Sequence, residues 1–131
     1  MKVSIVGASG YVGGEALRLL LDHPDVEVSQ VTSETFTGRF VHSVHPNLRK
    51  RSVLKFISVN DIKECDFLFL GLPHGSSSKM IDKFTSIAPK IIDLAADFRL
   101  NDSKLYDIYY GEPHTNPEML KKFVYGMPEL H

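Results

Sequence analysis

The chain has 131 residues, 43% of them hydrophobic and 24% charged, which is the size and composition of one folded domain. Its formal net charge of -1 gives no electrostatic argument for a nucleic-acid partner or an anionic membrane surface. The apolar start, MKVSIVGASG, is too short for a signal peptide or a membrane span, so we expect a cytoplasmic protein with no membrane partner, and the single cysteine excludes an internal disulfide framework.

The first thirty residues have the pattern strand, glycine turn, helix, strand. Residues 2–6 (KVSIV) are a short β-branched run, residues 11–23 have helical periodicity that Pro24 ends, and residues 26–32 (VEVSQVT) predict a second strand. The apolar positions expected to form the buried face of this helix are Val12, Ala16, Leu19 and Leu20. Such a unit joins parallel strands through a right-handed crossover.

The remainder of the chain continues the alternation of predicted strands and helices. Residues 33–53 are polar and rich in turn-formers, so we interpret them as a long excursion at the edge of the sheet. We predict strands at 53–57, 66–72 and 90–95, and helices at 76–87, 104–110 and 118–123. The near-continuous apolar run at 66–72 is typical of a central strand covered on both faces. We therefore expect residues 1–131 to form one dinucleotide-binding domain of the α/β class, with a doubly wound, Rossmann-type, mainly parallel sheet.

Three glycines stand between the first strand and the first helix, at a spacing of three residues. Gly7 permits a tight turn, Gly10 lets backbone N–H groups approach a pyrophosphate, and Gly13 lets the helix lie close to the strand. The helix N-terminus adds partial positive charge. The G-x-x-G-x-x-G spacing departs from the commoner G-x-G-x-x-G, and a tight turn without a ligand is the alternative interpretation.

The residues after the second strand bear on the choice between NAD and NADP. Ser33, Thr35 and Arg39 would cradle the extra phosphate of NADP, whereas Glu34 would repel it if its side chain pointed inward. We expect NADP(H) as the cofactor. The complete set of predicted cofactor-binding residues is Gly7, Ser9, Gly10, Tyr11, Val12, Gly13, Ser33, Thr35, Arg39, Leu72, Pro73, His74 and Gly75.

Two later loops follow buried strands, at the edge of the sheet where α/β proteins bind ligands. His74 and Gly75 are expected beside the cofactor, with a helix cap at Ser76 and a surface position for His74 as the alternative. Arg99 is expected to bind the phosphate or carboxylate of a substrate, and the alternative is that Asp97 and Arg99 form an ion pair or brace the loop.

His42 and His45 are spaced like a weak metal-binding pair, but no acidic or thiol side chain completes the set. We therefore predict no metal site. Cys65 precedes a buried strand and is interpreted as a core thiol rather than a nucleophile.

Six phrases carry a more specific resemblance: GASGYVGGEALRLLLDHP, VHPNLR, LGLPHG, DLAADFRL, YYGEPH and VYGMPEL. In this order and at these separations, they resemble the N-terminal part of the N-acetyl-gamma-glutamyl-phosphate reductase family over essentially the whole chain. The phrase FVHSVHPNLRKRSVLKF is similar to the lysine- and arginine-pathway members that reduce an aminoadipyl or glutamyl phosphate on an amino-group carrier protein.

The resemblance implies NADPH-dependent reductive dephosphorylation of an acyl phosphate to a semialdehyde through a cysteine nucleophile. In the family that cysteine lies in a Gly-Cys segment after the phrase that ends this chain, so the resemblance places it beyond His131 and implies no catalytic residue here. It also implies a homo-oligomer for the full-length enzyme and an acidic carrier as partner. The basic run at 49–51 (RKR) is either a docking site for that carrier or a solvated surface.

Two other functions are compatible with the glycine turn. A short-chain dehydrogenase or epimerase needs a Tyr-x-x-x-Lys pair, and none of the five tyrosines has Lys four residues later. A nucleotide-sensing domain without catalysis would share the same fold and glycines, and it stays open at this stage.

Overall fold

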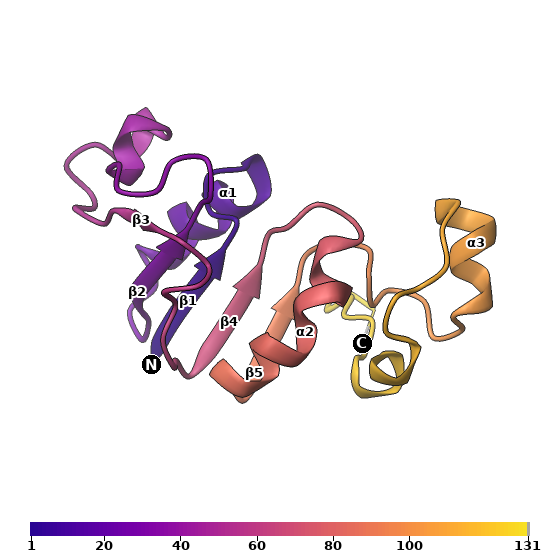
Figure 1. The fold of residues 1–131 in the computed structure, drawn as a ribbon. Helices are drawn as coiled ribbons and strands as arrows, with labels where there is room; N and C mark the ends of the chain where they lie inside the picture. Colours follow the sequence, from indigo (N-terminus) through magenta and orange to yellow (C-terminus); the bar gives the residue numbers. More distant parts are fainter. Residues whose placement is uncertain (131) are drawn as a thin grey trace.

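The computed structural model describes residues 1–130, which form a five-stranded, wholly parallel sheet with the strand order β3-β2-β1-β4-β5 (Figure 1). The strands are β1 (Lys2–Val6), β2 (Glu27–Thr32), β3 (Phe56–Ile57), β4 (Phe67–Leu70) and β5 (Lys90–Asp93). The chain runs outward from β1 to β3 and then crosses to β4 on the other side of β1. The doubly wound, parallel fold predicted from the sequence is confirmed.

One helix lies on each face of this sheet. The helices are α1 (Tyr11–Leu20), α2 (Ser76–Ile87) and α3 (Lys104–Tyr110), and short 3-10 turns occur at Val41–Ser43, Pro46–Leu48 and Pro117–Lys122. Because successive residues of a strand point to opposite faces, Ile5 packs with Leu17 of α1, whereas Val6 packs with Ile81 of α2. Figure 1 shows α3 to one side of the sheet, beyond β5. No helix within residues 1–130 is long and apolar enough to cross a membrane.

The predicted strand at 53–57 is only partly correct. Leu54–Phe56 pairs antiparallel with the returning excursion, through hydrogen bonds from Val41 N to Leu54 O (3.0 Å) and from Phe56 N to Arg39 O (2.9 Å). Only Phe56 and Ile57 pair with β2, opposite Val31 and Thr32. The first helix also ends at Leu20 rather than at residue 23, and the segment at 118–123 is a 3-10 turn.

The buried face predicted for the first helix is only partly correct: Leu20 packs against the core and Ala16 is half-buried, but the other two positions are exposed. Val12 and Leu19 are 55% and 56% exposed, and the buried positions of α1 are Gly13, Gly14 and Leu17. The glycines explain the difference. A Cβ at Gly13 would overlap the backbone of the preceding turn, and one at Gly14 would overlap the imidazole of His45, so the first turns of the helix pack closely through these two glycines.

Candidate functional site

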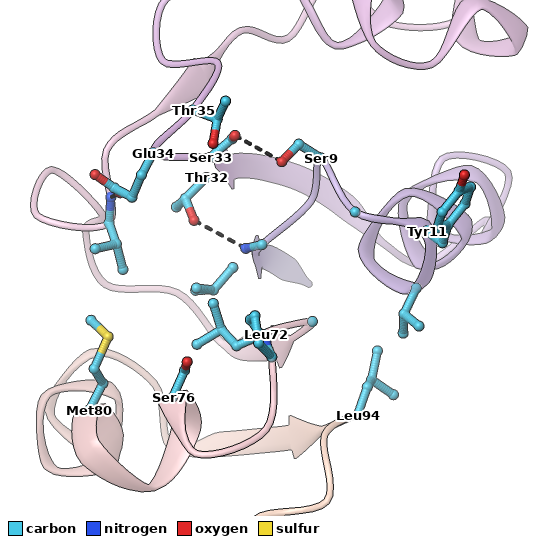
Figure 2. Close-up of a pocket in the computed structure, with 17 residues that line it drawn as sticks. Ser9, Tyr11, Thr32, Ser33, Glu34, Thr35, Leu72, Ser76, Met80 and Leu94 are labelled. Carbon is cyan, nitrogen blue, oxygen red and sulfur yellow. Dashed lines mark hydrogen bonds between the residues drawn. The ribbon is translucent and has the colours of Figure 1, made fainter.

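A cavity of about 640 Å³ opens at the carboxyl ends of β1, β2 and β4 (Figure 2). This position lies at the reversal of strand order between β1 and β4, where α/β sheets bind ligands. Figure 2 shows Ser76 and Met80 of α2 on the side of the cavity opposite to Ser9 and Ser33. The lining residues are Val6, Gly7, Ser9, Gly10, Tyr11, Val12, Thr32, Ser33, Glu34, Thr35, Val59, Gly71, Leu72, Pro73, Ser76, Met80 and Leu94.

The turn after β1 is fixed by main-chain contacts with both neighbouring strands. Gly7 N donates to Thr32 Oγ1 (3.2 Å), and Ala8 N donates to Thr32 O (2.9 Å). Gly7 has φ of +76°, and a Cβ there would overlap the carbonyl of Gly71, which follows β4. The turn therefore needs glycine at this position to pass between the ends of β2 and β4.

Gly10 differs from these packed glycines because the space beside it is open. It is the N-cap of α1, it makes no side-chain cap, and a Cβ there would meet only Gly7 O, at an ordinary 3.7 Å. Its φ of -76° is accessible to any residue. The protein's own packing does not require glycine here, but a pyrophosphate resting on the first-turn amides of α1 would require it. This cradle fits a dinucleotide.

The β2 side of the cavity is polar. Ser33 Oγ donates to Ser9 Oγ (2.8 Å) and accepts from Phe36 N (3.2 Å), which joins the glycine turn to the loop after β2. The carboxylate of Glu34 accepts from Val59 N (2.6 Å) and from Ser58 Oγ (3.1 Å). Figure 2 shows this side chain directed away from Ser9 and Ser33. The acidic group is thus bonded to the segment after β3 rather than aimed at the two serines.

The structure brings nine of the thirteen predicted cofactor residues together around the cavity: Gly7, Ser9, Gly10, Tyr11, Val12, Ser33, Thr35, Leu72 and Pro73. The other four lie outside its lining. Gly13 packs behind Gly7, and the Arg39 guanidinium lies over the Phe36 ring at 5.4 Å. His74 and Gly75 line a separate, small cavity of about 50 Å³. The lining also contains residues that were not predicted from the sequence: Val6, Thr32, Val59, Gly71, Met80 and Leu94. All of these except Val6 reach the glycine turn only through the packing of the sheet.

The predicted ion pair between Asp97 and Arg99 and the predicted helix cap at Ser76 are both wrong, whereas the bonds that Asp97 makes between two loops are those of the predicted loop brace. Asp97 is fully buried and binds Gly75 N (2.7 Å), Ser78 N (2.8 Å) and His74 Nδ1 (2.8 Å), rather than Arg99. The N-cap of α2 is Gly75, which has no side chain, so a carboxylate from another loop bonds the first amides of this helix in place of a serine cap.

Arg99 lines a second cavity, of about 550 Å³, together with Asp93 and Tyr125. Asp93 Oδ1 accepts from Ser77 Oγ (3.1 Å) and from Ala95 N (2.9 Å), but Asp93 Oδ2 is buried and has no partner within the described residues. Burial raises the pKa of the Asp93 carboxyl above its ordinary value, against the opposing effect of those two hydrogen bonds.

The two histidines of the possible metal-binding pair, Cys65 and the basic run all lie outside the two cavities. His45 Nε2 bonds Ala8 O (2.8 Å), while the ring of His42 stacks on Phe40 at 5.2 Å. Across residues 1–130 no group of three His, Cys, Asp or Glu side chains is placed to hold a metal ion. Cys65 is 8% exposed and belongs to the core under α2, as the sequence predicts. Arg51 forms an ion pair with Asp22.

Comparisons with known proteins agree with this geometry. Residues 2–131 match the family described as semialdehyde dehydrogenase, NAD binding domain. Curated relatives include a putative [LysW]-L-2-aminoadipate 6-phosphate reductase of Thermomicrobium roseum, 53% identical over 100% of this chain and 37% of the relative. The [LysW]-L-2-aminoadipate 6-phosphate reductase of Deinococcus radiodurans is 53% identical over 98% of this chain and 37% of the relative.

A putative [LysW]-L-2-aminoadipate/[LysW]-L-glutamate phosphate reductase of Thermococcus kodakarensis is 51% identical over 100% of this chain and 38% of the relative. The chain therefore spans somewhat more than a third of the length of these relatives. Among solved structures, aspartate semialdehyde dehydrogenase with NADP from Candida albicans has a TM-score of 0.65 and 21% identity, covering 78% of this chain and 31% of that one. This last likeness supports the fold.

The unpartnered carboxylate of Asp93 predicts an unusual pH dependence. Because its folded-state pKa lies above the unfolded value of 3.8, the folded state binds more protons between these two values, and the free energy of unfolding falls as pH rises through that interval. Asp93→Asn keeps the Oδ1 acceptor and removes the charge. We expect the variant to be more stable than wild type at pH 7 by roughly 1 kcal/mol, with the difference shrinking toward pH 4. Urea denaturation at both pH values measures it, and a variant that is less stable at pH 7 would contradict the assignment.

Proposed function

The chain belongs to the family of semialdehyde dehydrogenase NAD-binding domains, and on that premise we propose that the cavity at the glycine turn binds NADP(H) for the reduction of an acyl phosphate. The observation that carries this proposal is the open space beside Gly10, at the amino end of α1. Backbone amides there suit the pyrophosphate, the polar residues after β2 suit the adenosine ribose, and Leu72 and Pro73 suit the nicotinamide end.

NADP(H) rather than NAD(H) is favoured by the loop after β2. Ser33 and Thr35, which have hydroxyl side chains, line the cavity, and Glu34 is bonded to Ser58 and Val59 instead of facing the proposed position of the 2′-phosphate. Arg39 gives no support to this preference, because its guanidinium lies over the Phe36 ring. The preference for NADP(H) therefore depends on the hydroxyl groups of Ser33 and Thr35 and on the hydrogen bonds that keep the Glu34 carboxylate on Ser58 and Val59.

For the longer protein, we propose NADPH-dependent reductive dephosphorylation of a carrier-bound aminoadipyl or glutamyl phosphate, in lysine or arginine biosynthesis. The names of the curated relatives, which are [LysW]-linked aminoadipate or glutamate phosphate reductases, support this substrate class. When bound, the dinucleotide supplies the hydride, while the covalent step and the proton transfer belong to residues outside this chain. The described residues bind and orient the cofactor. We also propose a cytoplasmic location and a homo-oligomeric full-length enzyme.

The substrate's carrier is proposed to dock near residues 49–51. Arg49 and Lys50 are exposed, and the φ of +67° at Lys50 marks a turn that projects both side chains. Arg51 is already paired with Asp22, so the first two residues are the stronger candidates for contact with an acidic partner. Such a patch speeds association more than it adds contact energy.

The variant Gly10→Ala tests the proposed pyrophosphate site at the amino end of α1. Because the new Cβ meets no protein atom closer than 3.7 Å, we expect the variant to fold with wild-type stability and to bind NADPH at least tenfold more weakly in a fluorescence titration. Gly13→Ala is the matched comparison: its Cβ overlaps backbone, and overpacking of this kind costs about 2 kcal/mol of unfolding free energy. Undiminished NADPH binding by Gly10→Ala would rule out a pyrophosphate at this turn.

The variant Ser58→Ala tests whether the hydrogen bonds of the Glu34 carboxylate keep it away from the 2′-phosphate. Losing the Ser58 hydroxyl leaves the carboxylate held by Val59 N alone, so the charge becomes freer to swing toward the 2′-phosphate. We expect wild type to bind NADPH more tightly than NADH and Ser58→Ala to lose about threefold of that preference, since exposed charges interact weakly. Adding Glu34→Gln to Ser58→Ala should restore it. A wild-type preference for NADH would overturn the assignment of NADP(H).

Carrier docking is tested in the full-length enzyme with Arg49→Gln and Lys50→Gln together. Capture of the carrier-bound substrate should slow by about fivefold at low ionic strength and lose most of its salt dependence, while reduction of a small untethered acyl phosphate should hardly change. Lys90→Gln, at the opposite edge of the sheet, is the control, because it removes an exposed cation far from the cavity. Equal losses for both substrates would point to a defect in the active site rather than in docking.

A further inference from the structure

Asp97 is the most completely bonded charged residue near the cavity, and neither cofactor binding nor catalysis as described above uses it. Its side chain has no solvent exposure. Oδ1 accepts from Gly75 N (2.7 Å) and Oδ2 accepts from Ser78 N (2.8 Å), so the two oxygens bond the two amides at the amino end of α2. His74 Nδ1 lies 2.8 Å from Oδ1. A buried carboxylate is costly unless its oxygens are satisfied, and here both are.

The backbone carbonyl of Asp97 is also bonded, to side chains of α3 and of the segment that follows it. Its carbonyl accepts from Tyr106 Oη (2.7 Å) and from His114 Nε2 (2.6 Å). Tyr106 is 1% exposed, and burial raises the pKa of its hydroxyl, which keeps that group protonated and able to donate. Asp97 therefore joins the loop before α2, through its side chain, to α3 and the segment after it, through its backbone.

The Asp97 side chain joins its own loop, after β5, to the loop after β4, and both of these loops line the cavities described above. The loop after β4 lines the main cavity through Leu72 and Pro73, which precede Gly75 with only His74 between them. The loop after β5 lines the main cavity with Leu94 and the second cavity with Arg99. These positions lie on the β4 and β5 side, whereas the polar groups Ser33 and Thr35 lie on the β2 side.

We propose that Asp97 is a positioning residue that holds the loop after β4 against the nicotinamide half of the dinucleotide. The inference rests on the proposed cofactor site. Asp97 itself does not line the main cavity, and it acts through Leu72 and Pro73. Because the adenosine half contacts the β2 side, the loss of Asp97 should weaken only the interactions made by the other half of the ligand.

His74 supplies a second, independent readout of this arrangement. A carboxylate only accepts hydrogen bonds, so the contact with Asp97 places a proton on His74 Nδ1, and stacking on Tyr110 at 4.5 Å holds the ring. The ¹⁵N chemical shifts of the imidazole report which nitrogen carries the proton. They do so whether or not a dinucleotide binds.

The test compares two probes on the whole chain: NADPH and adenosine 2′,5′-bisphosphate, which has only the adenosine half. For Asp97→Asn we expect the Kd for NADPH to rise about tenfold and the Kd for the bisphosphate to stay within twofold of wild type. Asp97→Ala should behave the same way with a larger loss. Asp97→Ala leaves no side-chain acceptor for the Nδ1 proton, so it should also move the His74 ¹⁵N shifts away from the Nδ1-protonated form. Thr115→Val, which removes a 2.8 Å bond to Ser78 Oγ but leaves every bond of Asp97 intact, should match wild type with both probes.

The outcomes separate the two proposals. If wild type binds neither probe, the proposed cofactor site is wrong and this role fails with it, although the His74 shifts still report the contact with Asp97. If wild type binds both probes and Asp97→Asn weakens them equally, or weakens neither, the cofactor site stands and the positioning role is wrong. Should Asp97→Ala fail to fold, Asp97→Asn decides, because it retains one acceptor oxygen.

Discussion

The close main-chain contact of the turn after β1 with the ends of β2 and β4 is the constraint on which the rest of the structure depends. Gly71 N donates to Val6 O (2.8 Å) on one side of β1, and Ala8 N donates to Thr32 O (2.9 Å) on the other. No side chain fits at Gly7, so the turn passes between two strand ends and directs the amino end of α1 into the reversal of strand order. The position of the cavity follows from this contact.

The chemistry of the cavity is divided between its two sides. Hydroxyl groups gather after β2, whereas Leu72, Met80 and Leu94 make the β4 and α2 side apolar. Glu34 is the one charged residue of this lining, and its carboxylate is bonded to the segment after β3. A ligand with a polar phosphorylated end, a central pyrophosphate and a flat, apolar ring matches this division, and the amides of α1 lie between its halves.

The architecture and the glycine turn were predictable from the sequence because they depend on local patterns: apolar runs, their spacing, and glycine between a strand and a helix. The buried face of α1 was not, because periodicity marks apolar residues and the helix packs through Gly13 and Gly14 instead. The position of the Arg39 guanidinium and the partners of the Asp97 carboxylate were also beyond reach. Asp97 lies 22 residues from Gly75, and no local pattern shows that its carboxylate bonds the amino end of a helix that lacks a side-chain cap.

The central claim is that a dinucleotide lies across the carboxyl edge of the sheet with its pyrophosphate on α1. A crystal structure of the chain grown with NADPH measures this directly. The account predicts the pyrophosphate oxygens within hydrogen-bond distance of the first-turn amides beside Gly10, with the 2′-phosphate near Ser33 and Thr35 and the nicotinamide against Leu72 and Pro73. A dinucleotide bound in the second cavity, beside Arg99, with the glycine turn empty would contradict it.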